Sequence, residues 1–158
     1  MFRELHDLLT TEEIRWLNEE VKHFRLDLFQ LYNVQTIGTN ELLNYKNKVA
    51  EYLNSNFSER FILQSSWINR IDQSDADMDD YHLDSSDMTV VTYFNTDFTG
   101  GDFEYVYNNV PISVSPRVNL SLLMNNELKH RVTKVETGTR YSLASFYKLD
   151  NANKKRLL

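Results

Sequence analysis

The stretch MTVVTYFNTDFTGGDFEYVY, residues 88–107, indicates the fold of this chain. Two of its segments, Met88–Asn95 and Phe103–Tyr107, are rich in β-branched and aromatic residues, and the pair Gly100–Gly101 lies between them. Such residues favour strands, whereas paired glycines mark turns. We therefore predict two β-strands in this stretch, separated by a turn.

Segments of the same composition continue this pattern over most of the chain. Many short strands with turn signals between them are typical of a sandwich or barrel rather than of alternating βαβ units. We predict five further strands, at Phe61–Ile71, Tyr81–Leu83, Val118–Met124, His130–Val135 and Arg140–Leu149. The predicted breaks carry Asn108–Asn109, Pro111, Pro116, Asn125–Asn126 and Gly138.

Two helices are predicted before these strands. Thr10 and Glu13 have the spacing of a capping box, and apolar residues follow them at helical intervals. A second apolar face starts near Asn40 and reaches Leu53. The segment between them, residues 26–37, either extends the first helix or forms a short strand. We expect the helices to cover one face of the β core.

Length and composition indicate one globular domain. The chain has 158 residues, and 41% of them are hydrophobic, which suffices for a substantial core. We predict a single domain over residues 1–158. In this division, residues 1–57 form a helical support and residues 58–150 form the β core.

Several classes of function and location are disfavoured by composition. The chain has no cysteine, so disulfides and thiolate metal sites are excluded and any metal must be held by His, Asp or Glu. The net charge of −6 argues against nucleic acid as the main partner. No apolar run approaches the roughly 20 residues of a membrane helix, and residues 1–10 lack the apolar core of a secretory signal. We expect a cytoplasmic protein, in the host cell if it is phage-encoded, without a membrane partner.

Three residues have the types and spacing of an iron site. His82 and Asp84 stand two apart, so on a strand they would project to the same side, with Leu83 turned into the core. His130, at the start of another predicted strand, can supply a third ligand. Two histidines and one carboxylate leave coordination positions open for a co-substrate and dioxygen, as in non-haem Fe(II) oxygenases.

Arg140 and Ser142 follow at a distance suited to a co-substrate. They share one face of a predicted strand, where the guanidinium can pair with a carboxylate and the hydroxyl can add a hydrogen bond. We expect the chain to leave His130, turn at Gly138 and return alongside. A dicarboxylate such as 2-oxoglutarate could then bind Arg140 at one end and the metal at the other.

With these residues in place, the stretch 81–147 resembles the prolyl 4-hydroxylase-like branch of the Fe(II)/2-oxoglutarate oxygenases. The resemblance lies in three segments, Tyr81–Asp84, Val91–Phe103 and His130–Leu143. It implies a mainly β (α+β) double-stranded β-helix, or jelly roll, with the N-terminal helices packed on one sheet. Collagen-type members of this branch commonly carry lysine where this chain has Arg140, whereas oxygen-sensing and bacterial members carry arginine.

The resemblance also implies roles for individual residues. His82, Asp84 and His130 would be the catalytic iron ligands, and Arg140, Tyr93 and Ser142 would bind 2-oxoglutarate. Trp67 and Phe146 are candidates for the substrate side of the pocket. The implied cofactors are Fe(II), 2-oxoglutarate and O2, with ascorbate as a stimulating reductant. The implied reaction hydroxylates a prolyl residue of a peptide or protein and releases succinate and CO2.

Other interpretations stay open at this point. The same chemistry on a free amino acid or another small molecule is one alternative, and a non-enzymatic jelly-roll module that only binds metal is another. The acidic run Asp75-x-Asp77-x-Asp79 resembles the start of a calcium loop, but the sixth position is Asp80 instead of glycine and the twelfth is Ser86 instead of glutamate. A lid over the site and a plain solvated loop are the other interpretations of this run.

Overall fold

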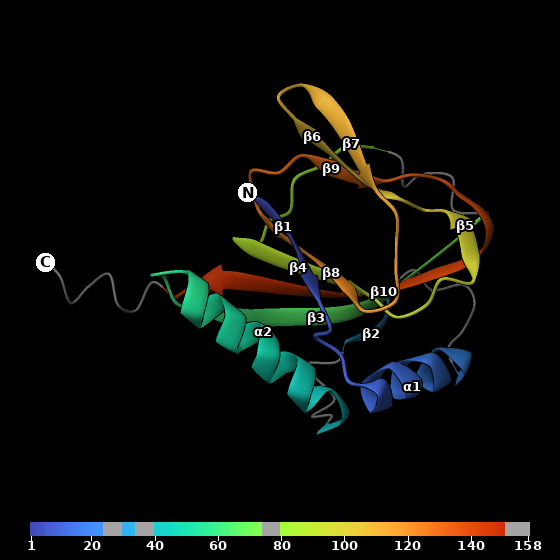
Figure 1. The fold of residues 1–158 in the computed structure, drawn as a ribbon, viewed down its shortest axis with the longest axis horizontal. Helices are drawn as coiled ribbons and strands as arrows, with labels where there is room; N and C mark the ends of the chain where they lie inside the picture. Colours follow the sequence, from blue (N-terminus) through green and yellow to red (C-terminus); the bar gives the residue numbers. More distant parts are fainter. Residues whose placement is uncertain (24–29, 34–39, 74–79, 151–158) are drawn as a thin grey trace, which may run out of the picture.

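The computed structural model describes residues 1–23, 30–33, 40–73 and 80–150. Its elements form three layers: a small sheet, a large sheet and a pair of helices (Figure 1). The expected mainly β jelly roll with helices on one sheet is confirmed.

The large sheet has seven strands, all paired antiparallel. In spatial order they are β1 (Phe2–His6), β8 (Leu120–Asn125), β4 (Met88–Tyr93), β10 (Val135–Leu149), β3 (Phe61–Asp72) and β2 (Gln30–Asn33), and β5 (Phe98–Gly100) pairs with β10 beside this row. β10 lies at the centre, where Ser142 is opposite Tyr93 on one side and Asn69 on the other. Arg140 and Ser142 are thereby placed in the middle of the large sheet.

The small sheet has three strands and lies over one face of the large one. β6 (Phe103–Tyr107) is its centre, with β7 (Val110–Val114) and β9 (His130–Val132) on either side. Buried residues from both sheets, among them Phe103, Leu122 and Met124, pack together between them. Alternate residues of each strand therefore face this inter-sheet space, which is where the site residues point.

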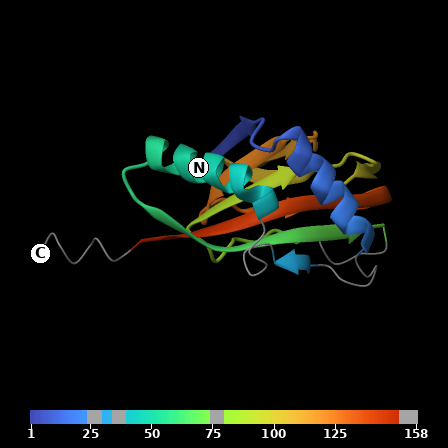
Figure 2. The same ribbon diagram turned by 90° about the horizontal axis from the view of Figure 1, so that it is seen from below.

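The helices cover the opposite face of the large sheet. α1 (Thr11–Glu20), continued by the 3-10 turn η1 (Val21–His23), and α2 (Leu43–Asn56), preceded by η2 (Asn40–Leu42), lie across its strands (Figure 2). Their buried residues pack against the sheet in a second core cluster that includes Leu17, Val49, Val90 and Leu143. The helices therefore support the sheet from behind and leave the inter-sheet face free for chemistry.

The capping box predicted at the first helix is present. Thr10 Oγ1 accepts from the Glu13 backbone N–H at 3.1 Å, and the Glu13 carboxylate accepts from the Thr10 N–H at 2.8 Å. The second carboxylate oxygen of Glu13 accepts from the Tyr45 N–H at 2.8 Å. One buried glutamate therefore caps α1 and joins it to the start of α2.

Some of the predicted elements differ from those observed. β1 lies in a segment for which no strand was predicted, and β7 runs through Pro111, which the sequence suggested as a break. Both are at sheet edges, where charged residues and proline are tolerated because one side of the strand needs no pairing. Between residues 26 and 37 the structure describes only β2, which confirms a short strand in that segment.

The expected turn at Gly138 is wrong. β10 runs without interruption through Gly138, whose φ of +74° lets the strand pass over residues 97 and 98 at contact distance. β9 and β10 belong to different sheets and do not pair with each other. His130 and Arg140 consequently face the same space from opposite sheets, which a hairpin would not have achieved.

Candidate active site

Backbone pairing brings the two histidines together. His82 and His130 form an isolated antiparallel bridge, with N–H···O distances of 2.9 and 3.0 Å in the two directions. Their rings lie 4.5 Å apart, between centroids. The segment carrying His82 is therefore fixed to the edge of β9, where both rings face the inter-sheet space.

Each ring has one nitrogen committed and one available. Nδ1 of His130 is 2.9 Å from the Leu128 carbonyl oxygen, and Nδ1 of His82 is 3.1 Å from that of Asp80. A carbonyl oxygen can only accept, so both Nδ1 atoms carry a hydrogen, and in the neutral tautomer Nε2 is then the nitrogen with the lone pair. Burial also lowers the pKa of His130, which favours the neutral imidazole that a metal requires.

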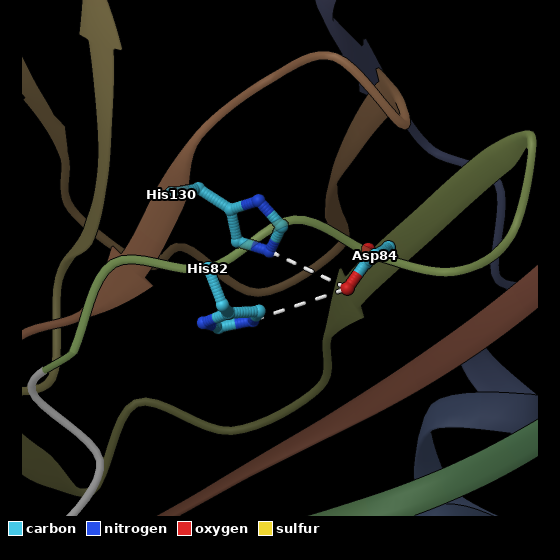
Figure 3. A group of neighbouring side chains, drawn as sticks. All are labelled: His82, Asp84 and His130. Carbon is cyan, nitrogen blue, oxygen red and sulfur yellow. Dashed lines mark ion pairs between the residues drawn. The ribbon is translucent and has the colours of Figure 1, made fainter.

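Asp84 completes the group from the other side. Its Oδ1 lies 3.9 Å from His82 Nε2 and 3.8 Å from His130 Nε2 (Figure 3). One ligand atom from each of the three residues falls within 4.8 Å of the others. Oδ2 accepts from the Thr89 hydroxyl at 2.7 Å, so the carboxylate is oriented by the strand behind it. The predicted ligand trio is therefore brought together with an arrangement that can hold one metal ion.

The local geometry around these ligands differs from the prediction. Tyr81–Leu83 is not a strand; only His82 makes a bridge. Leu83 is 56% exposed, so the expectation that it turns into the core is wrong. The chain does not pair onward after His82, and bends follow at residues 85–87. Asp84 reaches the site through its bond to Thr89, not through strand alternation alone.

Arg140 lies at the other end of the same space. It is 2% exposed and donates from Nε to the Gly101 carbonyl oxygen at 3.0 Å, from Nη1 to the Ser142 hydroxyl at 3.2 Å and from Nη2 to the Tyr93 hydroxyl at 3.1 Å. Its guanidinium carbon also stands 4.9 Å from the centre of the Tyr93 ring. Because both hydroxyls accept from arginine, each keeps its own hydrogen for another acceptor.

Within the described part of the chain, this buried cation has no carboxylate partner. Among the described residues, no Asp or Glu forms an ion pair with Arg140. An uncompensated charge in the interior costs several kcal/mol. Burial also raises the pKa of Tyr93, so its phenol stays protonated next to the guanidinium. The guanidinium of Arg140, together with the hydroxyls of Ser142 and Tyr93, is an arrangement suited to an anion.

A single cavity joins the two ends. It has a volume of about 240 Å³ and is lined by His82, Asp84 and His130 together with Arg140 and Ser142. The remaining wall is mostly apolar and includes Ile71, Val91, Phe103, Val132, Ala144 and Phe146. A small dicarboxylate therefore has room between the guanidinium and the three metal-ligand candidates.

The other candidates from the sequence fall in different places. Phe146 lines the cavity. Trp67, which is opposite Ala144, lies on the same face of β3 as the lining residues Asn69 and Ile71 but does not itself line the cavity. Tyr93 is fully buried and contacts Arg140, but it does not line the cavity. The acidic residues 75, 77 and 79 lie outside the described residues.

Two contributing residues were not foreseen. Thr89 orients Asp84, and Asn69 lines the cavity opposite Ser142. Thr89 could have been found, because it precedes Tyr93 by four residues on the same strand and so shares its face. Asn69 carried no comparable signal, because its place depends on the register between β3 and β10.

Comparison with known proteins bears directly on this geometry. The family model for the 2OG-Fe(II) oxygenase superfamily matches residues 67–148, just over half of the chain. The chain belongs to this superfamily. The matched region of the oxygenase contains all three metal-ligand candidates and Arg140.

Solved structures with the same fold include both prolyl hydroxylases and other oxygenases. The viral collagen prolyl hydroxylase of Paramecium bursaria Chlorella virus-1 is 15% identical, with a TM-score of 0.74 over 92% of this chain and 88% of that one. A Pseudomonas putida prolyl-4-hydroxylase is 14% identical, with a TM-score of 0.68 over 93% and 91%. HygX from Streptomyces hygroscopicus, solved with nickel and 2-oxoglutarate, is 13% identical, with a TM-score of 0.70 over 93% and 81%. At these identities, the likenesses show that the oxygenase shares its fold with both kinds of protein.

No curated protein matches the sequence of the oxygenase. Within the described residues, no helix combines the length and apolar character needed to span a membrane.

The residues present fit the cofactors of the superfamily. Two imidazoles and a carboxylate are a donor set for a divalent first-row metal, and Arg140, which forms no ion pair with a described carboxylate, suits an anionic co-substrate. The site thus fits Fe(II) together with 2-oxoglutarate. A metal held only for structure would have no use for the buried guanidinium.

Proposed function

We propose that this protein is a 2-oxoglutarate-dependent dioxygenase that hydroxylates prolyl residues in a peptide or protein. The observation that carries the proposal is buried Arg140, which has no carboxylate partner in the described part of the chain and lines the same cavity as His82, Asp84 and His130. We further propose that the chain acts as a single oxygenase domain. The cytoplasmic location and the stimulation by ascorbate stay predictions.

The proposed roles follow from the contacts. His82 and His130 would bind Fe(II) through Nε2, because each Nδ1 is held by a carbonyl, and Asp84 would bind through the oxygen that Thr89 leaves free. The bound iron would supply the reaction of dioxygen with 2-oxoglutarate, which yields succinate, carbon dioxide and hydroxylated product.

At the other end of the cavity, Arg140 would pair with the distal carboxylate of 2-oxoglutarate, and Ser142 would donate its hydroxyl hydrogen to it. Tyr93 would hold the guanidinium from behind. The direct contact between Tyr93 and the carboxylate, which the sequence suggested, stays a prediction. Burial of these donors excludes water, so the interaction with a carboxylate is stronger than it would be at the surface.

The wall of the cavity supports a prolyl substrate. Ile71, Val132 and Phe146 present apolar surface to the same space as the metal-ligand candidates. A pyrrolidine ring is apolar and lacks an N–H within a peptide, so it can enter such a wall without leaving a donor unpaired. The structural likeness to two prolyl hydroxylases adds to this support.

A small-molecule substrate is the second candidate. HygX has the same fold and has been solved with hygromycin B bound, so the fold also accommodates a small molecule. Charged or hydroxylated metabolites would need polar groups from the wall. The described polar lining residues already have roles: His82, Asp84 and His130 form the metal-ligand group, Thr89 supports Asp84, and Ser142 contacts Arg140. Among the described lining residues, this leaves Asn69 as the polar side chain available to a substrate. The wall therefore favours the prolyl substrate.

The proposal is tested by co-substrate turnover with matched peptides. Purified protein with Fe(II), 2-oxoglutarate and ascorbate is given proline-containing peptides and the same peptides with alanine in place of proline. We expect proline peptides to stimulate succinate formation and to gain the mass of one oxygen atom, while alanine peptides do neither.

The Asp84→Ala variant is the control for iron-dependent turnover and should lose both signals. If Asp84→Ala formed succinate at the rate of the wild type, the site assignment would be overturned. Stimulation by free amino acids or metabolites instead of proline peptides would overturn the prolyl substrate and leave the reaction class intact.

A further inference from the structure

Of the three metal-ligand candidates, His82 has the least support around its own side chain. Its side chain is 50% exposed, against 8% for His130. The His130 ring also stacks on buried Phe103, with centroids 5.2 Å apart. His82 has its Nδ1 contact with Asp80 and the neighbouring ring of His130. Something besides core packing must therefore fix the position of His82.

The residue after His82 does not provide this anchor. Leu83 is more than half exposed, although its apolar side chain could have fastened the segment to the core. Tyr81, the residue before His82, is held by neighbouring side chains. Tyr81 donates its hydroxyl hydrogen to the Glu104 carboxylate, and its ring lies 4.6 Å from the guanidinium carbon of Arg131.

Tyr81, Glu104 and Arg131 form a closed group on the outer face of the small sheet. Arg131 Nε donates to Glu104 Oε1 at 2.7 Å, and the two residues are directly opposite each other on β9 and β6. The ammonium nitrogen of Lys129 stands 5.7 Å from the centre of the Tyr81 ring and adds a second cation. The tyrosine is thus held by a hydrogen bond on its hydroxyl and by cation–π contacts on its ring.

Strand alternation relates this group to the metal-ligand candidates. His130 points into the inter-sheet space, so its neighbours at 129 and 131 point to the outer face. The bridge between His82 and His130 places Tyr81 beside the same strand. We propose that Tyr81, clamped between Glu104 and Arg131 on the outer face of the small sheet, is a positioning residue that holds His82 in place to bind the metal. The clamp and the histidines lie on opposite faces of one strand pair.

The inference rests on the proposed function, because it assumes that His82 is a metal ligand. Outer-shell partners of metal ligands change metal affinity by roughly 10- to 100-fold when they are removed. Tyr81 acts through the backbone rather than on the ring of His82, so we expect the lower part of this range. Loss of the clamp should weaken metal binding about 10-fold.

The test is the dissociation constant for Co(II) alone, measured anaerobically by its visible absorption. Tyr81→Leu removes the hydroxyl and the aromatic face and should raise the dissociation constant about 10-fold. Tyr81→Phe keeps the ring beneath Arg131 and should recover part of this loss. Tyr107→Leu is the matched control, because Tyr107 is an exposed tyrosine of the same sheet, and it should bind Co(II) like the wild type.

A double-mutant cycle separates positioning from a general loss of structure. If Tyr81 acts through His82, then Tyr81→Leu should have no further effect on Co(II) affinity in a His82→Ala background. The inference is overturned if Tyr81→Leu binds Co(II) within twofold of the wild type, or if its effect persists undiminished in His82→Ala. Failure of the wild type itself to bind Co(II) would instead overturn the metal site, and the proposed function with it.

Discussion

Arg140→Met isolates the contribution of the buried guanidinium to co-substrate binding. Methionine keeps much of the length of the side chain and removes its charge. In the wild type, Nη1 and Nη2 each donate one hydrogen to a hydroxyl, of Ser142 and Tyr93 respectively, and each keeps a second hydrogen for a carboxylate. A hydrogen bond to a charged group contributes about 1.5–3 kcal/mol. The loss of two such bonds costs about 3 kcal/mol or more, which corresponds to at least a 100-fold weaker affinity for 2-oxoglutarate.

The assay is isothermal titration calorimetry of 2-oxoglutarate into protein saturated with Mn(II), which holds metal occupancy constant. Arg117→Met is the matched control, because Arg117 is an exposed arginine paired with Glu4, and it should leave the dissociation constant unchanged. A dissociation constant for Arg140→Met within about threefold of the wild type, well under 1 kcal/mol, would refute the reasoning.

In contrast to its large effect on co-substrate affinity, Arg140→Met should have little effect on the stability of the ligand-free protein. Since the partners of buried Arg140 among the described residues are neutral oxygens and no carboxylate, its desolvation is offset only in part in the protein alone. Arg140→Met should therefore lower the free energy of unfolding of the ligand-free protein by no more than about 1 kcal/mol. A much larger loss in urea denaturation would show that the arginine serves the fold rather than the co-substrate.

Three further predictions concern single contacts. Ser142→Ala removes one donor to the carboxylate and should raise the calorimetric dissociation constant for 2-oxoglutarate about 3- to 10-fold. Gly101→Ala places a Cβ 3.0 Å from Arg140 Cδ at a φ of +65°, so urea denaturation should show a loss of about 1–3 kcal/mol. The hydrogen bond from Tyr81 lowers the pKa of Glu104 below its ordinary 4.5, so the ionised carboxylate stabilises the fold above pH 4.5. The thermal-melting advantage of wild type over Glu104→Gln should therefore be constant near neutrality and disappear as pH falls through the lowered pKa.

The metal-ligand group could be predicted because its chemistry is local in the sequence. His82 and Asp84 stand two residues apart, and His130 follows at a strand start, so residue type and spacing were enough to identify them. Ser142 was found from its spacing to Arg140, whereas Tyr93 was suggested by the family resemblance. They turned out to be opposite each other across β4 and β10, with Arg140 between their hydroxyls.

The way the chain presents these residues could not be predicted in the same manner. The sequence suggested a hairpin at Gly138 because glycine marks turns, but a positive φ within a long strand also needs glycine. Leu83 was expected inside because it alternates with His82 and Asp84 on a predicted strand, but only His82 makes a bridge and Leu83 is exposed. In both cases the outcome depends on which distant strand is the neighbour, and a single sequence does not encode that locally.

The lack of a carboxylate partner for Arg140 among the described residues likewise could not be predicted from the sequence. Whether a buried arginine has a carboxylate partner depends on every side chain around it, including Tyr93 and Gly101, which are 47 and 39 residues away. Likewise, the clamp on Tyr81 joins residues from three separate segments, residues 81, 104 and 131. Features of this kind become visible only when the strands are assembled.

The most direct test of the central claim is an anaerobic titration of Fe(II) and 2-oxoglutarate into the purified protein, followed by visible absorption. Chelation of iron by the co-substrate within the site should produce a weak metal-to-ligand charge-transfer band. We predict that this band appears with the wild type and is absent with Asp84→Ala. Wild-type protein that demonstrably binds Fe(II) and yet gives no band at saturating 2-oxoglutarate would contradict the account.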